Sequence, residues 1–268
     1  MKRFVSIALF TASLSVLTTA CFTNPVTGRK SLNLVNESEM RQLGTTQYTS
    51  FLASNPAVTG TNANADMVKR IGNRMAAAVN EYLKMKGQQS LVSGYQWEFN
   101  LVNNNQVNAW CMPGGKVVVY TGILPVTQTE TGLAVVMGHE IAHAIARHGN
   151  ERMSQGLVAQ FGGEALSAAL SSKPAQTQNL FNSIYGIGAQ GGLLAYSRSQ
   201  ETEADEMGLY FMALAGYDPN EAVNFWGRMA AQSGQKPMEL LSTHPADSRR
   251  VSDIKGWLPR AMQYYKPK

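Results

Sequence analysis

The 268-residue chain contains only two cysteines, Cys21 and Cys111, and only 15% of its residues are charged. It has no basic run interleaved with aromatic residues, so the sequence does not support nucleic-acid binding. No internal repeat of about 20–50 residues occurs, which excludes most repeat architectures. The hydrophobic share of 44% is instead typical of a globular protein with a sizeable core.

The first twenty residues lack any acidic residue and predict a signal peptide. Lys2 and Arg3 form a basic start, residues 4–17 are an apolar stretch, and residues 18–20 are small. The alternatives are a buried N-terminal helix or a retained membrane anchor. The stretch is short for a membrane span, and a small-residue cleavage site follows it, so we predict that residues 1–20 are removed. The remaining 21 basic and 18 acidic residues leave a small excess, compatible with mild attraction to anionic lipid.

The position of Cys21 resembles a bacterial lipobox, in which the cysteine becomes the lipidated first residue. A lipobox usually has leucine three residues before the cysteine, where this chain has Thr18. We predict lipidation rather than ordinary secretion, because a lone cysteine here has little other use. Cys111 would then be the one thiol left, so no intramolecular disulfide is expected. Phe22 resembles the second residue of lipoproteins sorted to the outer membrane, which predicts an envelope location facing the periplasm.

Periodicity predicts a mostly helical α+β domain over residues 37–268, preceded by a polar tether over residues 21–36. Apolar residues at three- and four-residue spacing predict helices near 37–54, 64–87, 133–147 and 198–215. Alternation of polar and apolar residues predicts three short strands near 96–101, 107–112 and 116–120, paired in a small antiparallel sheet. Gly216 is a suitable end for the last of these helices, and Asp218 with Pro219 predicts a new helix start.

The run His139-Glu140-Ile141-Ala142-His143 lies inside one of these helices. Four residues make a little over one helical turn, so both imidazoles leave the same face and can share one metal ion. Glu140 is offset by about 100° from His139, which lets its carboxylate reach the attacking water rather than the metal. A pair of surface histidines is the alternative. An apolar run precedes the motif, however, and the whole chain has only four histidines. We therefore predict a zinc site with His139 and His143 as ligands and Glu140 as base.

A catalytic zinc ion generally needs a third protein ligand and an open position. His148 is five residues past His143, about 140° off its face, and is expected to point elsewhere. Glu201 and Asp205 share a face of the 198–215 helix, whereas Glu203 points away from it. Such a pair suits one ligand and one acid that orients a ligating histidine, although a solvated helix start explains the cluster equally well. Spacing alone cannot choose between Glu201 and Asp205.

Four ordered motifs resemble those of the gluzincin peptidases of the HtpX and Ste-protease family. They are residues 139–143, the run Ser197–Asp205 that begins 54 residues after His143, Asn108-Ala109-Trp110 with Pro113-Gly114-Gly115, and His244-Pro245 with Arg250. The resemblance covers roughly residues 25–260. Together with the predicted signal peptide and Cys21, it points to the soluble, envelope-located members. It implies a zincin-like helical domain that hydrolyses peptide bonds.

The resemblance also implies roles for residues that spacing leaves open. Glu201 becomes the third zinc ligand and Asp205 the acid behind the ligands. Asn108, Ala109 and Trp110 would lie on an edge strand lining the active-site cleft, where backbone groups bind an extended peptide.

His244 is implied to lie near the metal. It either contacts the reacting carbonyl oxygen or occupies the open position and keeps the enzyme latent; a helix-initiating His-Pro turn is the structural alternative. Arg250 would hold that loop or polarise the carbonyl. Cys111 could be an inhibitory ligand, but a buried small hydrophobic role is the expectation.

Taken together, the motifs predict a zinc-dependent endopeptidase with one Zn²⁺ per chain, and the resemblance adds misfolded or misassembled envelope proteins as substrates. The alternative is a zinc-stabilised, largely latent lipoprotein that acts as an envelope chaperone or assembly factor, with residues 151–195 as a lid. A membrane-embedded prenyl-protein protease is rejected, because no apolar run of about 18 residues occurs outside the signal segment. Some envelope members dock partners through C-terminal helical repeats. The sequence up to Lys268 shows none, so docking of that kind is not expected.

Overall fold

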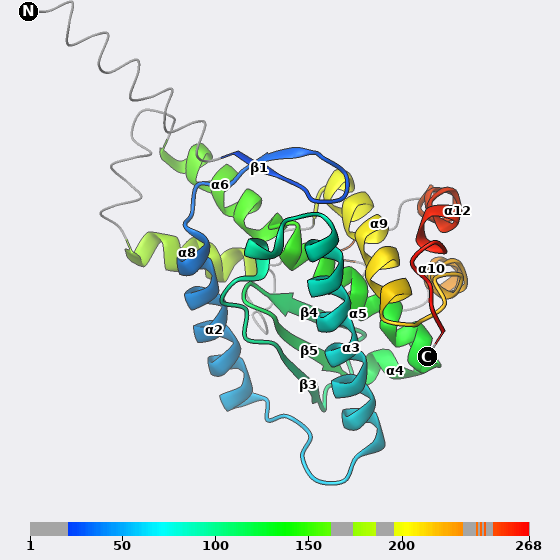
Figure 1. Ribbon diagram of the computed structural model, residues 1–268. Coiled ribbons are helices and arrows are strands. Elements are labelled where there is room, and N and C mark those ends of the chain that lie inside the picture. The colour runs from blue at the N-terminus through cyan, green and yellow to red at the C-terminus, as the bar shows by residue number, and fades with distance from the viewer. Residues whose placement is uncertain are drawn as a thin grey trace, which may run out of the picture.

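The computed structural model describes residues 21–161, 174–185, 196–232, 240, 242, 244 and 249–267. The predicted signal peptide, Pro245 and parts of the 151–195 segment lie outside the described residues. Helices predominate around one small sheet (Figure 1), which confirms the mostly helical α+β prediction.

The central sheet has three strands, β3 (Glu98–Val102), β4 (Ala109–Met112) and β5 (Lys116–Tyr120), in the order β3-β5-β4. β4 runs antiparallel to β5 as expected, whereas β3 runs parallel to it. The sheet is therefore mixed, and the expectation of antiparallel pairing is wrong for β3. Alternation predicts a strand but not its neighbour, and here β5 lies between the two strands that precede it in the chain.

Helices cover both faces of the sheet, because side chains along β5 alternate between them. Val117 and Val119 face a core shared with α3 (Ala63–Met85) and α5 (Glu130–Ile145). Val118 and Tyr120 face a second cluster with α2 (Glu37–Ser54), α6 (His148–Phe161) and α8 (Pro174–Tyr185). The metal motif on α5 is thus buried at the centre of the molecule.

Two glycines bring α5 against α9 (Arg198–Leu214). A Cβ added at Gly208 would lie 3.0 Å from the backbone nitrogen of His139, and one added at Gly138 would lie 3.1 Å from the carbonyl oxygen of Gly208. The backbones therefore meet without an intervening side chain. α9 lies beside α5 (Figure 1), and the acidic run of α9 is close to the histidines of α5.

The remaining described helices are α4 (Leu124–Thr127), α10 (Glu221–Gln232), α12 (Arg250–Ala261) and the 3-10 helices η1 (Gln89–Val92) and η2 (Thr121–Ile123). α10 and α12 pack on the side of α5 and α9 that faces away from the sheet. α10 begins at Glu221, two residues after the predicted start at Pro219, and Asp218 Oδ1 accepts a hydrogen bond from Asn220 N, the kind of contact that an N-cap residue makes. Within the described part of the chain, no helix combines the length and the apolar character needed to cross a membrane.

Residues 21–36, expected to be a tether, pack against the body instead. β1 (Cys21–Thr23) pairs antiparallel with β2 (Lys30–Leu32), and we call residues 21–32 the N-terminal hairpin. After it, Leu34 N donates to Ser154 Oγ (2.7 Å) and Asn150 Nδ2 donates to Val35 O (2.7 Å), which attaches the segment to α6. The polar composition indicates an exposed linker, but these polar groups are used for hydrogen bonds to distant residues.

Candidate metal centre

Two capped helices position the candidate site. α5 begins where Thr129 Oγ1 accepts from Gly132 N (3.0 Å), and every residue from Gly132 to Ile145 is buried. α9 begins with a capping box, in which Ser197 N donates to Gln200 Oε1 and Gln200 N donates to Ser197 Oγ. Glu201 follows directly in the first turn. The motif histidines therefore project from a buried helix towards the start of α9.

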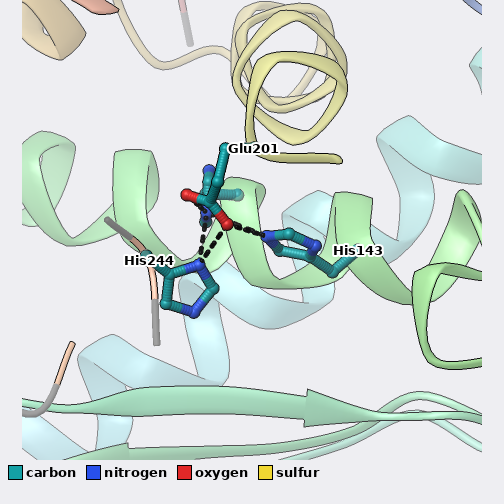
Figure 2. A group of neighbouring side chains, drawn as sticks. His143, Glu201 and His244 are labelled. Carbon is teal, nitrogen blue, oxygen red and sulfur yellow. Dashed lines mark hydrogen bonds and ion pairs between the residues drawn. The ribbon is translucent and has the colours of Figure 1, made fainter. Parts of the chain in front are cut away.

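Four buried side chains meet at the crossing of these helices: His139, His143, Glu201 and His244. Each offers a ligand atom, and these atoms all lie within 4.8 Å of one another. Figure 2 shows the Glu201 carboxylate, from α9, between the rings of His143 and His244. We call this group the four-residue cluster.

The distances orient each ring. Glu201 Oε1 lies 3.2 Å from His143 Nε2 and 2.8 Å from His244 Nδ1. Glu201 Oε2 lies 3.5 Å from His139 Nε2, and the Nε2 atoms of the two motif histidines are 3.0 Å apart. Both motif histidines thus present Nε2 to one point. Three imidazoles and a carboxylate form a donor set that suits zinc.

The charges around the cluster favour a cation. Burial opposes a charged imidazole at His139, but the carboxylates of Glu201 and Asp205 outweigh it and raise the pKa of His139 to about 10. Burial likewise opposes ionisation of Glu201, yet the neighbouring His244 and His139 hold its pKa well below the usual range. When Glu140 is also ionised, three buried carboxylates, those of Glu140, Glu201 and Asp205, lie with the positive charges of Arg250 and a protonated His139 among the described residues, so negative charge is in excess. A divalent cation would balance that excess.

Asp205 and Arg250 lie behind the cluster. Asp205 Oδ1 is 2.9 Å from His139 Nδ1, while Arg250 Nε donates to Asp205 Oδ2 (2.6 Å) and Arg250 Nη2 donates to Glu201 Oε2. The guanidinium carbon is 3.8 Å from the ring centre of Trp226. These contacts join Arg250 to the two acids, whereas the expected roles were to hold the loop of His244 or to polarise the carbonyl.

Glu140 lies next to the four-residue cluster. Its Oε1 atom is buried and has no hydrogen-bond partner among the described residues, although His244 Nε2 lies 3.4 Å away. Burial raises the pKa of the Glu140 carboxyl above its ordinary value. An unpartnered buried oxygen beside the cluster is where a water molecule or a substrate group would be received.

The predicted substrate strand is β4, at the edge of the sheet. Tyr120 N donates to Asn108 O, and because such groups alternate along a strand, the backbone groups of Ala109 and Cys111 face away from β5, where Asn108 Oδ1 already accepts from Ala109 N (2.9 Å). The side chain of Trp110 points to the other face, where its ring packs edge-on against Phe51. The Trp110 side chain therefore does not contribute to the strand edge at which an extended peptide would bind.

Cys111 does not belong to the four-residue cluster. Its thiol is buried against the core that includes α5, and burial raises the pKa of the thiol well above its usual value. A protonated, buried thiol matches the small hydrophobic role expected for it.

Sequence reasoning missed the importance of His148, Glu203 and Tyr196. His148 is outside the ligand cluster, as predicted, but its Nδ1 atom lies 2.8 Å from His143 Nδ1. Its Nε2 atom lies 3.1 Å from Glu203 Oε2, and the Tyr196 ring stacks on His143 at 3.9 Å. All four histidines of the chain gather here, and their scarcity was the available signal for His148. No local pattern marks Tyr196.

Comparison with known proteins places these residues in a family context. Residues 62–258 match peptidase family M48. The chain is 36% identical over 209 residues to the mitochondrial metalloendopeptidase OMA1 of Schizosaccharomyces pombe, covering 75% of this chain and 60% of the relative. It is 37% identical over 185 residues to OMA1 of Saccharomyces cerevisiae, covering 66% and 51%. It is 32% identical over 193 residues to the beta-barrel assembly-enhancing protease of Yersinia pestis, covering 70% and 37%. The chain thus spans less than two thirds of each relative's length.

Proposed function

The chain belongs to peptidase family M48, and from that premise we propose that it is a zinc-dependent endopeptidase. His139, His143 and Glu201 would hold one zinc ion. The observation that carries the proposal is the buried four-residue cluster, with the unpartnered Oε1 atom of Glu140 beside it. The metalloendopeptidase and protease names of the relatives support the same reaction class.

Each residue has a distinct task in the proposed reaction. A bound zinc ion would supply Lewis-acid chemistry and lower the pKa of the attacking water. Glu140 Oε1 accepts the proton of that water and passes it to the leaving amine. Asp205 fixes the ring of His139 by accepting from Nδ1, and Arg250 fixes the carboxylates of Glu201 and Asp205.

The substrate would be an extended segment of an unfolded protein. The carbonyl of Ala109 and the backbone groups of Cys111 face away from β5 and can pair with peptide backbone whatever its side chains, whereas Ala109 N is already bound to Asn108 Oδ1. Misfolded or misassembled envelope proteins are the substrates we propose, supported by the name of the Yersinia pestis relative.

The proposed location is the bacterial envelope, with attachment to the outer membrane through lipidated Cys21. Relatives occur in mitochondria as well as bacteria, so the support comes from the signal-like first twenty residues and from Cys21, which is exposed. Acyl labelling of the wild type against Cys21→Ser tests the anchor, since the proposal requires loss of the label.

The contacts of His244 favour a latent resting state for the same enzyme. His244 Nδ1 takes part in the cluster where a catalytic zinc ion keeps an open position. Leu240 N also donates to Val107 O (3.1 Å), two residues before β4 begins, so Leu240 contacts the approach to the substrate edge. This closure is the one observation that favours the second candidate, a zinc-stabilised lipoprotein that acts as an envelope chaperone or assembly factor.

Glu140→Gln tests the reaction. The variant should retain one zinc ion per chain, because Glu140 is not a ligand, and should cleave unfolded casein about 10²–10⁴-fold more slowly. Glu81→Gln is the matched control, since Glu81 is exposed on α3, and a chelator should abolish wild-type cleavage. Undiminished cleavage by Glu140→Gln would overturn the mechanism. No cleavage by any form of the protein would favour the second candidate.

A further inference from the structure

The two motif histidines have different partners on the side away from the cluster. His139 Nδ1 faces the carboxylate of Asp205 at 2.9 Å. Among the described residues no acid faces His143 Nδ1, which lies 2.8 Å from His148 Nδ1. Because His143 presents Nε2 to the cluster, its ring proton belongs on Nδ1, and His148 must accept that proton's hydrogen bond.

A single neutral form of His148 satisfies both of its ring nitrogens. With its own proton on Nε2, His148 accepts from His143 at Nδ1 and donates to Glu203 Oε2, 3.1 Å away. His148 is 0% exposed and Glu203 is 3% exposed, so water does not replace these contacts. The orientation of the His143 ring therefore depends on a line of two further side chains.

The N-terminal hairpin completes that line. Thr27 Oγ1 donates to Glu203 Oε1, and Arg29 Nε donates to Glu203 Oε2 (2.7 Å). The two terminal nitrogens of Arg29 bind both oxygens of Glu151, at 2.7 and 2.8 Å. Arg29 thus joins α9, through Glu203, to α6, which carries Glu151 and begins at His148.

We propose that His148 and Glu203 are positioning residues for His143, and that Arg29 of the N-terminal hairpin holds them in place. The hairpin then supports the orientation of a metal ligand, although it lies more than a hundred residues from α9 in sequence. The inference rests on the proposed zinc site. A partner that receives the outer N–H of a ligating histidine typically changes metal affinity about 10–100-fold when removed.

The first test measures zinc affinity by competition with a chelating dye. His148→Phe keeps a ring but offers no acceptor, so its affinity should fall about 10–100-fold. His148→Gln can accept from His143 and donate to Glu203, so it should recover part of the loss. Unchanged affinity in His148→Phe would show that His148 is only a core residue, and equal losses in both variants would show that its hydrogen bonds are irrelevant.

The second test does not disturb the core. Arg29 is partly exposed, and Arg29→Gln should weaken zinc binding about threefold to tenfold, a fraction of the effect of a direct partner. Lys30→Gln removes the same charge from an exposed neighbour on β2 and should leave the affinity unchanged. Equal affinities for these two variants would overturn the role of the hairpin. Because both tests measure binding, zinc binding by the wild type without cleavage by any form of the protein, His244→Ala included, defeats the endopeptidase proposal alone, whereas a wild type without zinc defeats both.

Discussion

At the residue scale, the cluster contains one imidazole more than a working peptidase site requires. His244 Nδ1 lies 2.8 Å from Glu201 Oε1 and 3.1 Å from His139 Nε2, on equal terms with the motif ligands. A catalytic zinc ion keeps one position open, whereas a structural one is closed by four protein ligands. The described arrangement resembles the closed kind.

His244→Ala should therefore increase cleavage of unfolded casein while zinc stays at one ion per chain. If the open arrangement is about 10% populated in the wild type, the expected gain is about tenfold. The double variant His244→Ala/Glu140→Gln should abolish the gain, which would locate the extra cleavage in this site. A decrease in the single variant would instead mean that His244 assists the reaction at the carbonyl oxygen.

The relative positions of site residues could be predicted from the sequence where those residues lie on one helix. His139, Glu140 and His143 follow from the geometry of one turn, because their relative directions are fixed within α5. Spacing left Glu201 and Asp205 tied, since both face α5 from one side of α9. In the structure Glu201 reaches the cluster and Asp205 reaches the outer nitrogen of His139. That choice depends on how two helices cross, which no local pattern contains.

At the scale of elements, the crossing of α5 and α9 sets the distance between the motif histidines and Glu201. It depends on Gly138 and Gly208, whose lack of side chains lets the backbones meet. A methyl group at Gly208 would lie 3.0 Å from His139 N, closer than ordinary van der Waals contact, and the opposing atom belongs to a rigid helix. The helices would have to separate.

Gly208→Ala should thus lower the free energy of unfolding by about 1–3 kcal/mol, because the strain exceeds the gain in helix propensity. Zinc affinity should fall as well, since the ligands sit on both helices. Gly227→Ala on α10 is the matched control: nothing lies within 4 Å of the added Cβ, so it should be neutral or stabilising by about 0.5–1 kcal/mol. Urea unfolding of both variants checks this, and equal midpoints would contradict a tight crossing.

The bounds of helices and strands could largely be predicted from the sequence, whereas the pairing of the strands could not. The helix expected over residues 37–54 has those bounds, and the strand expected over 116–120 is β5. The parallel partnership of β3 with β5 escaped prediction, because alternation within a strand does not determine which strand lies beside it.

At the scale of the whole molecule, the structure of the N-terminal segment differs most from what its sequence predicts. Residues 21–36 have the polar composition of a tether, yet Arg29 binds Glu151 and Glu203, which are 122 and 174 residues away. The composition of a segment indicates only its average polarity. It cannot report that a few polar groups find buried partners of opposite charge. A lipid on Cys21 would therefore hold the body close to the bilayer, with little free linker between them.

Docking of this hairpin should depend on pH. Burial would raise the pKa of Glu151, but the hydrogen bonds from Arg29 and Gln200 outweigh it and hold the pKa below its ordinary value of 4.5. Between the folded and the ordinary value, the folded state binds fewer protons than the unfolded state. The contribution of the Glu151 carboxylate to stability is thus complete above about pH 4.5 and is lost as the pH falls through the folded pKa.

Glu151→Gln should therefore be less stable than the wild type by about 1–2 kcal/mol near neutral pH, the usual effect of losing hydrogen bonds to a charged group. The difference should shrink as the pH falls below the ordinary carboxyl value of 4.5, because the wild-type carboxyl then becomes as neutral as the amide. Urea unfolding across this range measures the difference, with a chelator present throughout so that release of metal in acid does not contribute.

The control is Glu81→Gln, exposed on α3, which should show a small difference from wild type that does not change with pH. A difference between Glu151→Gln and wild type that stayed constant into acid would mean that the charge of the Glu151 carboxylate does not stabilise the docked hairpin.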